Sequence, residues 1–507
     1  MTNVIISAEP ITFDELVSVA RHGAKVALCD ATKEKINASR ESVERMIKNK
    51  EIVYGITTGF GSFYNKTINP EQVEELQRNL IVSHAAGVGD PLPGDVVRAM
   101  MLLRVKSLSH GFSGIRLEVV EKLLEMLNKG IVPHIPEKGS LGASGDLCPL
   151  SHMALPLLGK GEAYFNGKLL PGDEAMKAAG IETIELKAKE GLALNNGTQC
   201  MTAIGALAVY DAEYLLETAE KSASLTLEAL NGRLDAFDPR IHEKRNQVGQ
   251  VQSAEKIRKH TEGSEYLLTP GTKNARVQDA YTLRCIAQVH GASRDALSYI
   301  KSVVFREMNA VTDNPLIFPE DDGATAISGG NFHGQPIALV MDFLGIAVAE
   351  LGNISERRLE RLVNKDLSNG LPAYLTDTDK GGLHSGFMIV QYTSAALVSE
   401  NKILAHPASV DSIPSSNNQE DHVSMGTIAA RKAAAIIKNV RRVIAMELLA
   451  AAQAIDLRNK GVTPQNLGKS TKAVYNTIRE NVPPMFEDRV IAPDVKKVSD
   501  LIKERKF

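Results

Sequence analysis

Three consecutive small residues, Ala143-Ser144-Gly145, could build a reactive group from the backbone itself. Gly145 has no side chain, so a tight turn could bring its backbone nitrogen against the carbonyl carbon of Ala143. Attack by that nitrogen with loss of water would close a ring. Loss of the Ser144 hydroxyl as a second water would then leave an exposed methylidene. Such a product is an electrophile, a reagent that ordinary side chains do not supply. The triplet alone carries little weight, because a flexible Gly/Ser loop has the same composition.

The residue spacings expected for three other kinds of site are absent from the sequence. A nucleophile elbow needs the pattern G-x-S-x-G, but position 146, where the second glycine would fall, is Asp. The 12 histidines form no H-x-x-x-H pair, so a zinc site has no support. The four cysteines form no C-x-x-C pair and indicate reduced, mostly buried thiols in a cytosolic protein.

Charge and composition favour a small-molecule substrate. The 507 residues carry 58 basic and 61 acidic side chains, a net charge of -3, which gives no electrostatic reason for nucleic-acid or membrane partners. The N-terminus lacks the features of a signal peptide, and we expect no stretch long and uncharged enough to span a bilayer. A cytoplasmic protein is therefore expected.

Several polar residues elsewhere could do chemistry, although each also has a purely structural explanation. Tyr54 stands among three glycines, which indicates a loop, and a packing tyrosine in a turn would look the same. Gln278, Tyr281 and Arg284 have helical spacing and would share one face, as a solvated polar stripe also would. Asn195 could be a turn or helix-cap residue.

Together these segments resemble the aromatic amino acid ammonia-lyases, whose Ala-Ser-Gly triad cyclises to 4-methylidene-imidazole-5-one (MIO). The matching segments run in the expected order from Tyr54 to His422 and include the Gly-Asn-Phe-His-Gly run at 330–334. The resemblance implies a catalytic set and a substrate-binding set. The first is Tyr54 as base, Ala143, Ser144, Gly145 and Tyr281, and the second is His84, Asn195, Gln278, Arg284, Phe332 and Glu420.

Two of these positions point to one branch of the family. His84 and Glu420 resemble the histidine-selective branch, since relatives acting on phenylalanine carry an apolar residue at the first place and no carboxylate at the second. The implied reaction is elimination of ammonia from L-histidine to give trans-urocanate, the first step of histidine degradation, with MIO and without pyridoxal phosphate or metal. The alternatives are another MIO enzyme (a tyrosine ammonia-lyase or an aminomutase), an inactive helical scaffold, and a fumarase-like lyase without MIO.

The first part of the chain is expected to be mixed. Thr12 and Glu15 predict a capping box, and Gly87 is expected to cap the helix that ends at residue 84. Asp146 is expected near the N-terminus of a short helix reaching residue 158, whose positive end would face the cyclised group. An Asn166-Gly167 turn predicts a hairpin. Periodicity predicts helices over 12–19, 32–48, 71–84, 95–108 and 116–129.

Beyond residue 200 the pattern is one of long, apolar helices, expected over 201–231, 274–305, 335–365 and 425–458. No repeat of fixed period occurs. We therefore predict a mainly α protein, with a part at 1–200 that carries the MIO-forming loop and a large antiparallel helical bundle at 201–507, or one continuous domain. The resemblance implies a fumarase/aspartase-like homotetramer with active sites shared between subunits.

Overall fold

The computed structural model describes residues 3–59, 61, 68, 72–269, 272, 276–320, 323–376 and 382–507. The chain is mainly helical, as predicted, and it divides into two compact units. The first unit comprises Met1–Leu207, Lys301–Asp342 and Pro407–Arg431, and the second comprises Ala208–Ile300, Phe343–His406 and Lys432–Phe507. Each unit therefore gathers segments that are distant in sequence.

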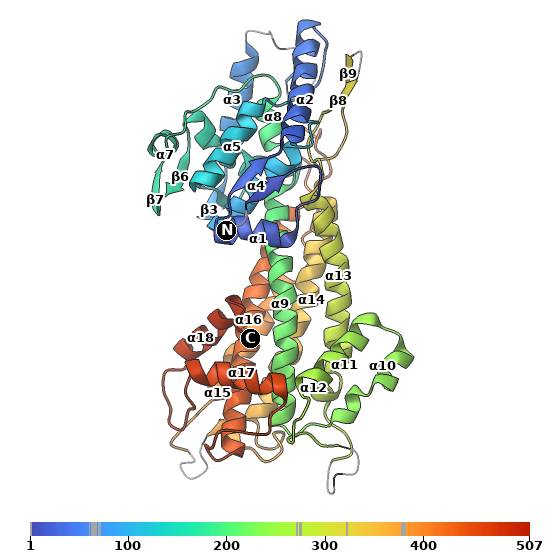
Figure 1. The fold of residues 1–507 in the computed structure, drawn as a ribbon, viewed down its shortest axis with the longest axis vertical. Helices are drawn as coiled ribbons and strands as arrows, with labels where there is room; N and C mark the ends of the chain where they lie inside the picture. Colours follow the sequence, from blue (N-terminus) through green and yellow to red (C-terminus); the bar gives the residue numbers. More distant parts are fainter. Residues whose placement is uncertain are drawn as a thin grey trace. The chain divides into compact units, whose positions relative to one another are not determined.

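The first unit combines short helices with small sheets (Figure 1). Strands β1 and β2 pair in parallel, β3 pairs with β5, β8 pairs with β9, and β4, β6 and β7 form a three-stranded sheet. Its elements are β1 (Val4–Ile6), α1 (Phe13–His22), β2 (Val26–Leu28), α2 (Asp30–Lys48), α3 (Val73–His84), β3 (Val88–Pro91), α4 (Gly94–Leu108), α5 (Leu117–Lys129), β4 (Val132–Pro133), β5 (Pro136–Lys138), α6 (Leu147–Ala154), the 3-10 helix η3 (Leu155–Leu158), β6 (Glu162–Phe165), β7 (Lys168–Pro171), α7 (Gly172–Ala178), α8 (Glu190–Asn195), β8 (Leu316–Glu320) and β9 (Gly323–Ile327).

Long helices dominate the rest of the chain. Four of them contribute residues to both units: α9 (Gln199–Ala229), α13 (Ile286–Met308), α14 (Gln335–Val363) and α16 (Gly426–Arg458). The second unit also contains the 3-10 helices η4 (Leu234–Phe237) and η5 (Ala373–Leu375), and α10 (Pro239–Arg245), α11 (Val248–His260), α12 (Tyr281–Arg284), α15 (Met388–Leu404), α17 (Lys469–Asn481) and α18 (Ala492–Lys503).

One buried carboxylate ties three of the long helices together inside the second unit. Glu447 of α16 accepts hydrogen bonds from Thr226 of α9 (2.8 Å) and from Ser355 of α14 (2.6 Å). Arg358 of α14 pairs with it through two bonds of 2.5 and 2.9 Å. A buried ion pair with these additional donors compensates the loss of hydration that burial imposes on both charges.

Helix α14 is apolar and long enough to cross a membrane by length and composition, so the expectation that no stretch would qualify was wrong. However, 72% of its most apolar window is buried inside the protein. A helix that is apolar on most faces and surrounded by others is a core helix. The high apolar content of α14 is therefore explained by its burial among the other helices.

Most local predictions in the first unit are confirmed. Thr12 and Glu15 form both bonds of the capping box at the start of α1. Asn166 and Gly167 connect β6 to β7 with φ of 49° and 77°, the left-handed pair that such a hairpin turn needs.

Two predictions failed because distant groups override local sequence. Helix α3 ends at His84, but its cap is Ala85, and the Gly87 N–H instead donates to Nε2 of His152 (3.0 Å). The start of the helix predicted over 274–305 is also wrong, whereas its later part is confirmed as α13. Residues 274 and 275 lie outside the described part of the chain. Residues 276–280 are not helical, a single turn (α12) follows, and α13 begins at Ile286.

Candidate active site

The triad lies in a tight turn that only glycines can form. Gly142 and Gly145 pair with each other across an isolated antiparallel bridge, at φ of 78° and 74°. Gly145 also pairs with Gly197, so a Cβ added to Gly145 would collide with the Gly197 carbonyl and lie 3.0 Å from the Phe332 carbonyl oxygen. The turn therefore combines left-handed backbone with close approach of a second chain segment, and both need glycine.

Asp146 holds the far end of this turn. It is fully buried and occupies the N-cap position of α6, so the triad lies beside a helix N-terminus as predicted. Its carboxylate accepts hydrogen bonds from the Ser140 hydroxyl (2.9 Å), the Met201 N–H (2.8 Å) and the Thr427 hydroxyl. Burial raises the pKa of Asp146, and these donors counteract that rise.

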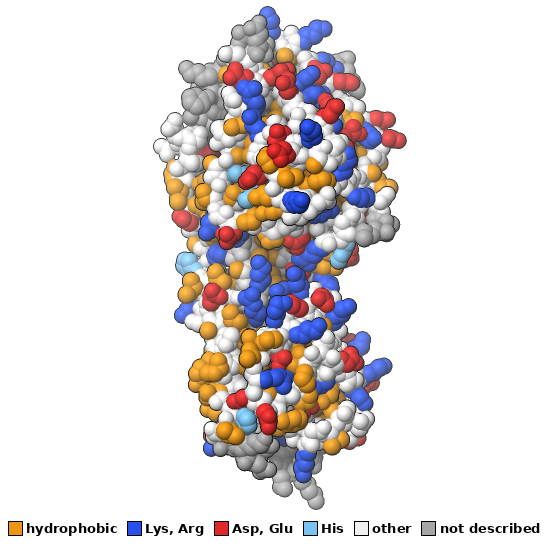
Figure 2. All heavy atoms as spheres, turned by 90° about the vertical axis from the view of Figure 1, so that its left-hand side faces the viewer, with side chains coloured by type: hydrophobic (Ala, Val, Ile, Leu, Met, Phe, Trp, Pro, Cys, Tyr) orange, Lys and Arg blue, Asp and Glu red, His pale blue; other side chains and the backbone are white. Residues whose placement is uncertain are grey.

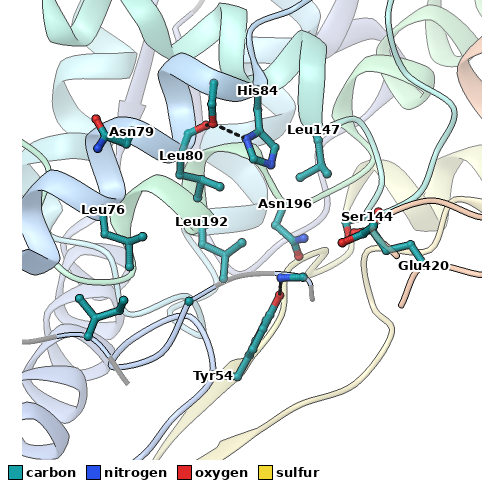
Figure 3. Close-up of a pocket in the computed structure, with 15 residues that line it drawn as sticks. Tyr54, Leu76, Asn79, Leu80, His84, Ser144, Leu147, Leu192, Asn196 and Glu420 are labelled. Carbon is teal, nitrogen blue, oxygen red and sulfur yellow. Dashed lines mark hydrogen bonds between the residues drawn. The ribbon is translucent and has the colours of Figure 1, made fainter. Parts of the chain in front are cut away.

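A cavity of about 590 Å³ opens beside Ser144, entirely within the first unit (Figure 3). Polar side chains reach it from separate elements: Tyr54 from a loop, His84 from the end of α3, Asn196 from the end of α8, and Glu420 from a later loop. Its walls are largely apolar and include Leu76, Leu80, Leu147 and Leu192. A mostly apolar cavity with a few convergent polar groups is the common form of a small-molecule site.

Glu420 and the triad serine are in direct contact. The Ser144 hydroxyl donates to Oε1 of Glu420 at 3.0 Å, and the Ser415 hydroxyl donates to Oε2 at 3.1 Å. These two contacts hold the carboxylate at the cavity wall. A carboxylate so placed can accept a hydrogen bond from a ligand N–H group.

Tyr54 and His84 are both perturbed by burial. Tyr54 Oη accepts a hydrogen bond from the Gly61 N–H at 3.2 Å. Burial raises the pKa of Tyr54, that hydrogen bond lowers it, and the nearby Glu420 charge raises it again. Burial lowers the pKa of His84, which keeps its ring neutral at pH 7, and its Nδ1 lies 3.0 Å from the Ser83 hydroxyl.

Of the adjacent asparagines, the one at the cavity is Asn196 and not the predicted Asn195. Asn195 is fully buried, and its side-chain amide donates to the Ser151 hydroxyl at 3.1 Å, away from the cavity lining. Asn196 follows the last turn of α8 and lines the cavity together with Leu192. Sequence reasoning selected the wrong neighbour.

The remaining predicted residues divide between the two units. Phe332 belongs to the first unit, and its backbone carbonyl lies against Gly145. Gln278 and Arg284 line a separate cavity of about 260 Å³ in the second unit. Arg284 Nε donates to the Asp279 carbonyl at 3.0 Å, and its guanidinium lies 4.5 Å from the ring centroid of Tyr281, which is 70% exposed. None of these three second-unit residues is among the residues that line the first cavity.

Comparisons with known proteins identify the family. The family described as aromatic amino acid lyase matches residues 11–480. The chain belongs to that family. It is 58% identical over 503 residues to histidine ammonia-lyase from Caldanaerobacter subterraneus subsp. tengcongensis, covering 99% of this chain and 97% of the relative. It is 57% identical to histidine ammonia-lyase from Symbiobacterium thermophilum, covering 97% and 95%.

Solved structures of the family share the fold. Histidine ammonia-lyase from Trypanosoma cruzi matches with a TM-score of 0.91 at 43% identity, covering 100% of this chain and 94% of that one. Tyrosine aminomutase from Streptomyces globisporus matches with a TM-score of 0.93 at 38% identity, covering 100% and 97%. The fold is therefore common to family members whose names give different reactions, and the side chains at the cavity have to distinguish them.

Proposed function

We propose that this chain is a soluble, cytoplasmic histidine ammonia-lyase that converts L-histidine to trans-urocanate and ammonia. The observation that carries the proposal is the meeting of Ser144, His84 and Glu420 at one cavity. The triad serine marks the chemistry, whereas the imidazole and the carboxylate suit a substrate whose ring carries N–H groups. Full-length relatives named histidine ammonia-lyase, 53–58% identical, support the same substrate.

The triad fits the MIO group that the family implies. A left-handed Gly145 with no room for a Cβ places its nitrogen in a tight turn with Ala143, and the Ser144 hydroxyl faces the cavity. The positive end of the α6 dipole lies next to this turn and favours electron withdrawal there. Once formed, MIO supplies an electrophile that turns the substrate amine into a better leaving group.

Glu420 and His84 hold the substrate ring. The Glu420 carboxylate accepts a hydrogen bond from a ring N–H, a contact that a phenyl ring does not offer. Because burial lowers the pKa of His84, its neutral ring can accept or donate one hydrogen bond without adding charge to the site. The leucine walls exclude water, which strengthens these polar contacts.

Tyr54 removes the proton from the β-carbon of the substrate. A phenol with a raised pKa is a poor base at neutral pH, so it needs more positive charge than the Gly61 N–H alone provides. We assign the substrate carboxylate to an Arg284 contributed by another subunit of the assembly proposed below, because a guanidinium can bind a carboxylate through two hydrogen bonds. Gln278 and Tyr281, which are near it in sequence, order the amine.

We further propose a homotetramer in which each active site takes residues from more than one subunit. Large apolar side chains are exposed on α14 and α15: Phe343 (40%), Ile346 (48%), Ile389 (55%), Tyr392 (59%) and Ile403 (71%). Figure 2 shows hydrophobic side chains between charged ones at the surface of one face. Contiguous exposed apolar surface commonly marks a protein interface. Chromatography that showed an active monomer would contradict this assembly.

The test is turnover of L-histidine without added cofactor, followed as urocanate absorbance, together with the intact mass. The mature chain is expected to be lighter than its sequence by two water molecules and to release ammonia. Ser144→Ala is expected to retain the mass of its sequence and to lose turnover. Full activity of that variant would exclude the proposed mechanism.

Another MIO reaction is the second candidate, because a tyrosine aminomutase shares the fold at 38% identity. Parallel assays with L-tyrosine and L-histidine separate the two. Rapid conversion of tyrosine with none of histidine would favour the alternative.

A further inference from the structure

Glu420 stands at the end of an unusual turn. Residues Ser416, Asn417 and Asn418 have φ of 51°, 53° and 64°, three consecutive left-handed residues without a glycine. L-amino acids adopt this conformation at a cost, and usually as single residues. Strain of this kind persists only where surrounding contacts fix the backbone, and it clusters at functional sites.

Ser415 and Glu420 close this turn with three hydrogen bonds. The Ser415 N–H donates to the Glu420 carbonyl at 3.0 Å, and the Glu420 N–H donates to the Ser415 carbonyl at 3.2 Å. The third bond joins the side chains, from the Ser415 hydroxyl to Oε2 of Glu420 at 3.1 Å. The two backbone hydrogen bonds fix the position of the Glu420 backbone, and the Ser415 hydroxyl fixes the orientation of the Glu420 carboxylate.

The two carboxylate oxygens of Glu420 accept hydrogen bonds from different donors, and only one of these donors is lost when the triad cyclises. Oε1 accepts from the Ser144 hydroxyl, and Oε2 accepts from Ser415. Dehydration of Ser144 removes that hydroxyl together with the α-hydrogen as one water, so Oε1 loses its donor. Ser415 takes no part in that step and keeps its bond to Oε2. The oxygen that becomes available is the one aimed at the triad and the cavity.

We propose that Ser415 is a positioning residue for ring recognition, which keeps Oε2 of Glu420 occupied so that Oε1 faces the substrate imidazole. This inference rests on the proposed function, since it concerns the ring that Glu420 reads. The same turn also lies close to Gly61, since a Cβ added there would be 2.5 Å from Ser416 Oγ. The Gly61 N–H in turn donates to Tyr54 Oη.

The first experiment compares Ser415→Ala with Ser415→Thr and with a matched control. Losing a hydrogen bond to a charged group is expected to lower kcat/KM for histidine about tenfold, with the two-water mass deficit retained. Ser415→Thr keeps the hydroxyl and is expected to restore most of the rate. The control is Ser412→Ala, which removes a hydroxyl of the same loop that accepts from the Val423 N–H and not from Glu420. Its kcat/KM is expected to stay near the wild-type value.

The second experiment asks whether Ser415 acts through Glu420. Affinity for urocanate, which carries the same ring, is measured by calorimetry for Ser415→Ala alone and in a Glu420→Ala background. If Ser415 works only by orienting that carboxylate, its substitution costs affinity in the first case and none in the second. Equal losses in both backgrounds would overturn the proposal, as would Ser415→Ala with wild-type turnover.

These outcomes separate this inference from the proposed function. A wild-type chain that formed no urocanate would refute both. A wild-type chain that formed urocanate while Ser415→Ala and Ser412→Ala lost equal activity would refute only the role of Ser415.

Discussion

Replacement of Gly145 by alanine tests the physical basis of the triad. Gly145 has φ of 74°, and an added Cβ would meet the Gly197 carbonyl far inside the 3.0 Å limit that real Cβ atoms respect. A left-handed alanine costs about 1–2 kcal/mol, and overpacking of a tight site adds about 1–3 kcal/mol. The free energy of unfolding should therefore fall by about 2–5 kcal/mol.

The same collision should stop ring closure. To admit the methyl group, Gly197 has to move away, and its carbonyl is also the acceptor of the Asp146 N–H at 2.6 Å. Both the bridge between Gly145 and Gly197 and this hydrogen bond would be lost, and with them the tight turn on which the proposed ring closure depends. Intact mass spectrometry should find Gly145→Ala at the mass of its sequence, without the loss of two waters.

Gly167 supplies the matched control. It has nearly the same φ, 77°, but a Cβ there meets nothing within 4 Å. Gly167→Ala should lose only the left-handed strain, about 1–2 kcal/mol, and should show the full two-water deficit. Urea unfolding and intact mass of both variants provide the comparison. If Gly145→Ala matured normally and unfolded like Gly167→Ala, the argument that close packing drives cyclisation would be refuted.

Three further predictions follow from the site and from one buried histidine. Glu420→Gln should lower kcat/KM for histidine at least about tenfold, since a charged acceptor is lost; an unchanged value would remove Glu420 from ring recognition. Because burial raises the pKa of Tyr54, turnover should increase with pH through the alkaline range, and Tyr54→Phe should abolish that rise along with most activity; a wild-type rate flat in pH there would argue against this base. Burial lowers the pKa of His260 from 6.5 to about 4, so the unfolded chain binds its proton first as pH falls. Urea unfolding should show a stability loss of about 2 kcal/mol from this group between pH 7 and pH 5. His260→Gln should reduce that loss, and an identical pH dependence in both proteins would contradict the assignment.

Local sequence predicted those elements whose ends are decided locally. Helix α1 begins at the capping box in which Thr12 and Glu15 hydrogen-bond to each other, and these two residues are close neighbours in the sequence. Helix α5 ends at Lys129, and the Gly130 that caps it has φ of 82°, a conformation that needs no distant partner. In such cases the side chain that fixes the boundary lies next to it, so the sequence contains the necessary information.

Boundaries set by distant partners were not predictable in the same way. The buried carboxylate of Asp279 accepts from the Arg233 N–H at 2.6 Å and pairs with Arg276. Ala280 is extended, with ψ of 160°, which stops the helical pattern there. The spacing of Gln278, Tyr281 and Arg284 looked helical, yet only the last two share a helix turn. Arg233 is too far away in sequence for any local pattern to include it.

The chemical assignments depended on resemblance more than on periodicity, and Asn195 shows where that reasoning fails. Consecutive helical residues point about 100° apart, so only one of two neighbouring asparagines can face a given cavity. Leu192 lines the cavity, and the residue on its face one turn later is Asn196, at i+4, whose N–H donates to the Leu192 carbonyl at 2.9 Å. If Leu192 had been known to line the cavity, counting four residues onward along the helix would have selected Asn196 from the sequence. The error therefore lay in the orientation of one short helix, which is set by packing around the cavity and not by the identity of either asparagine.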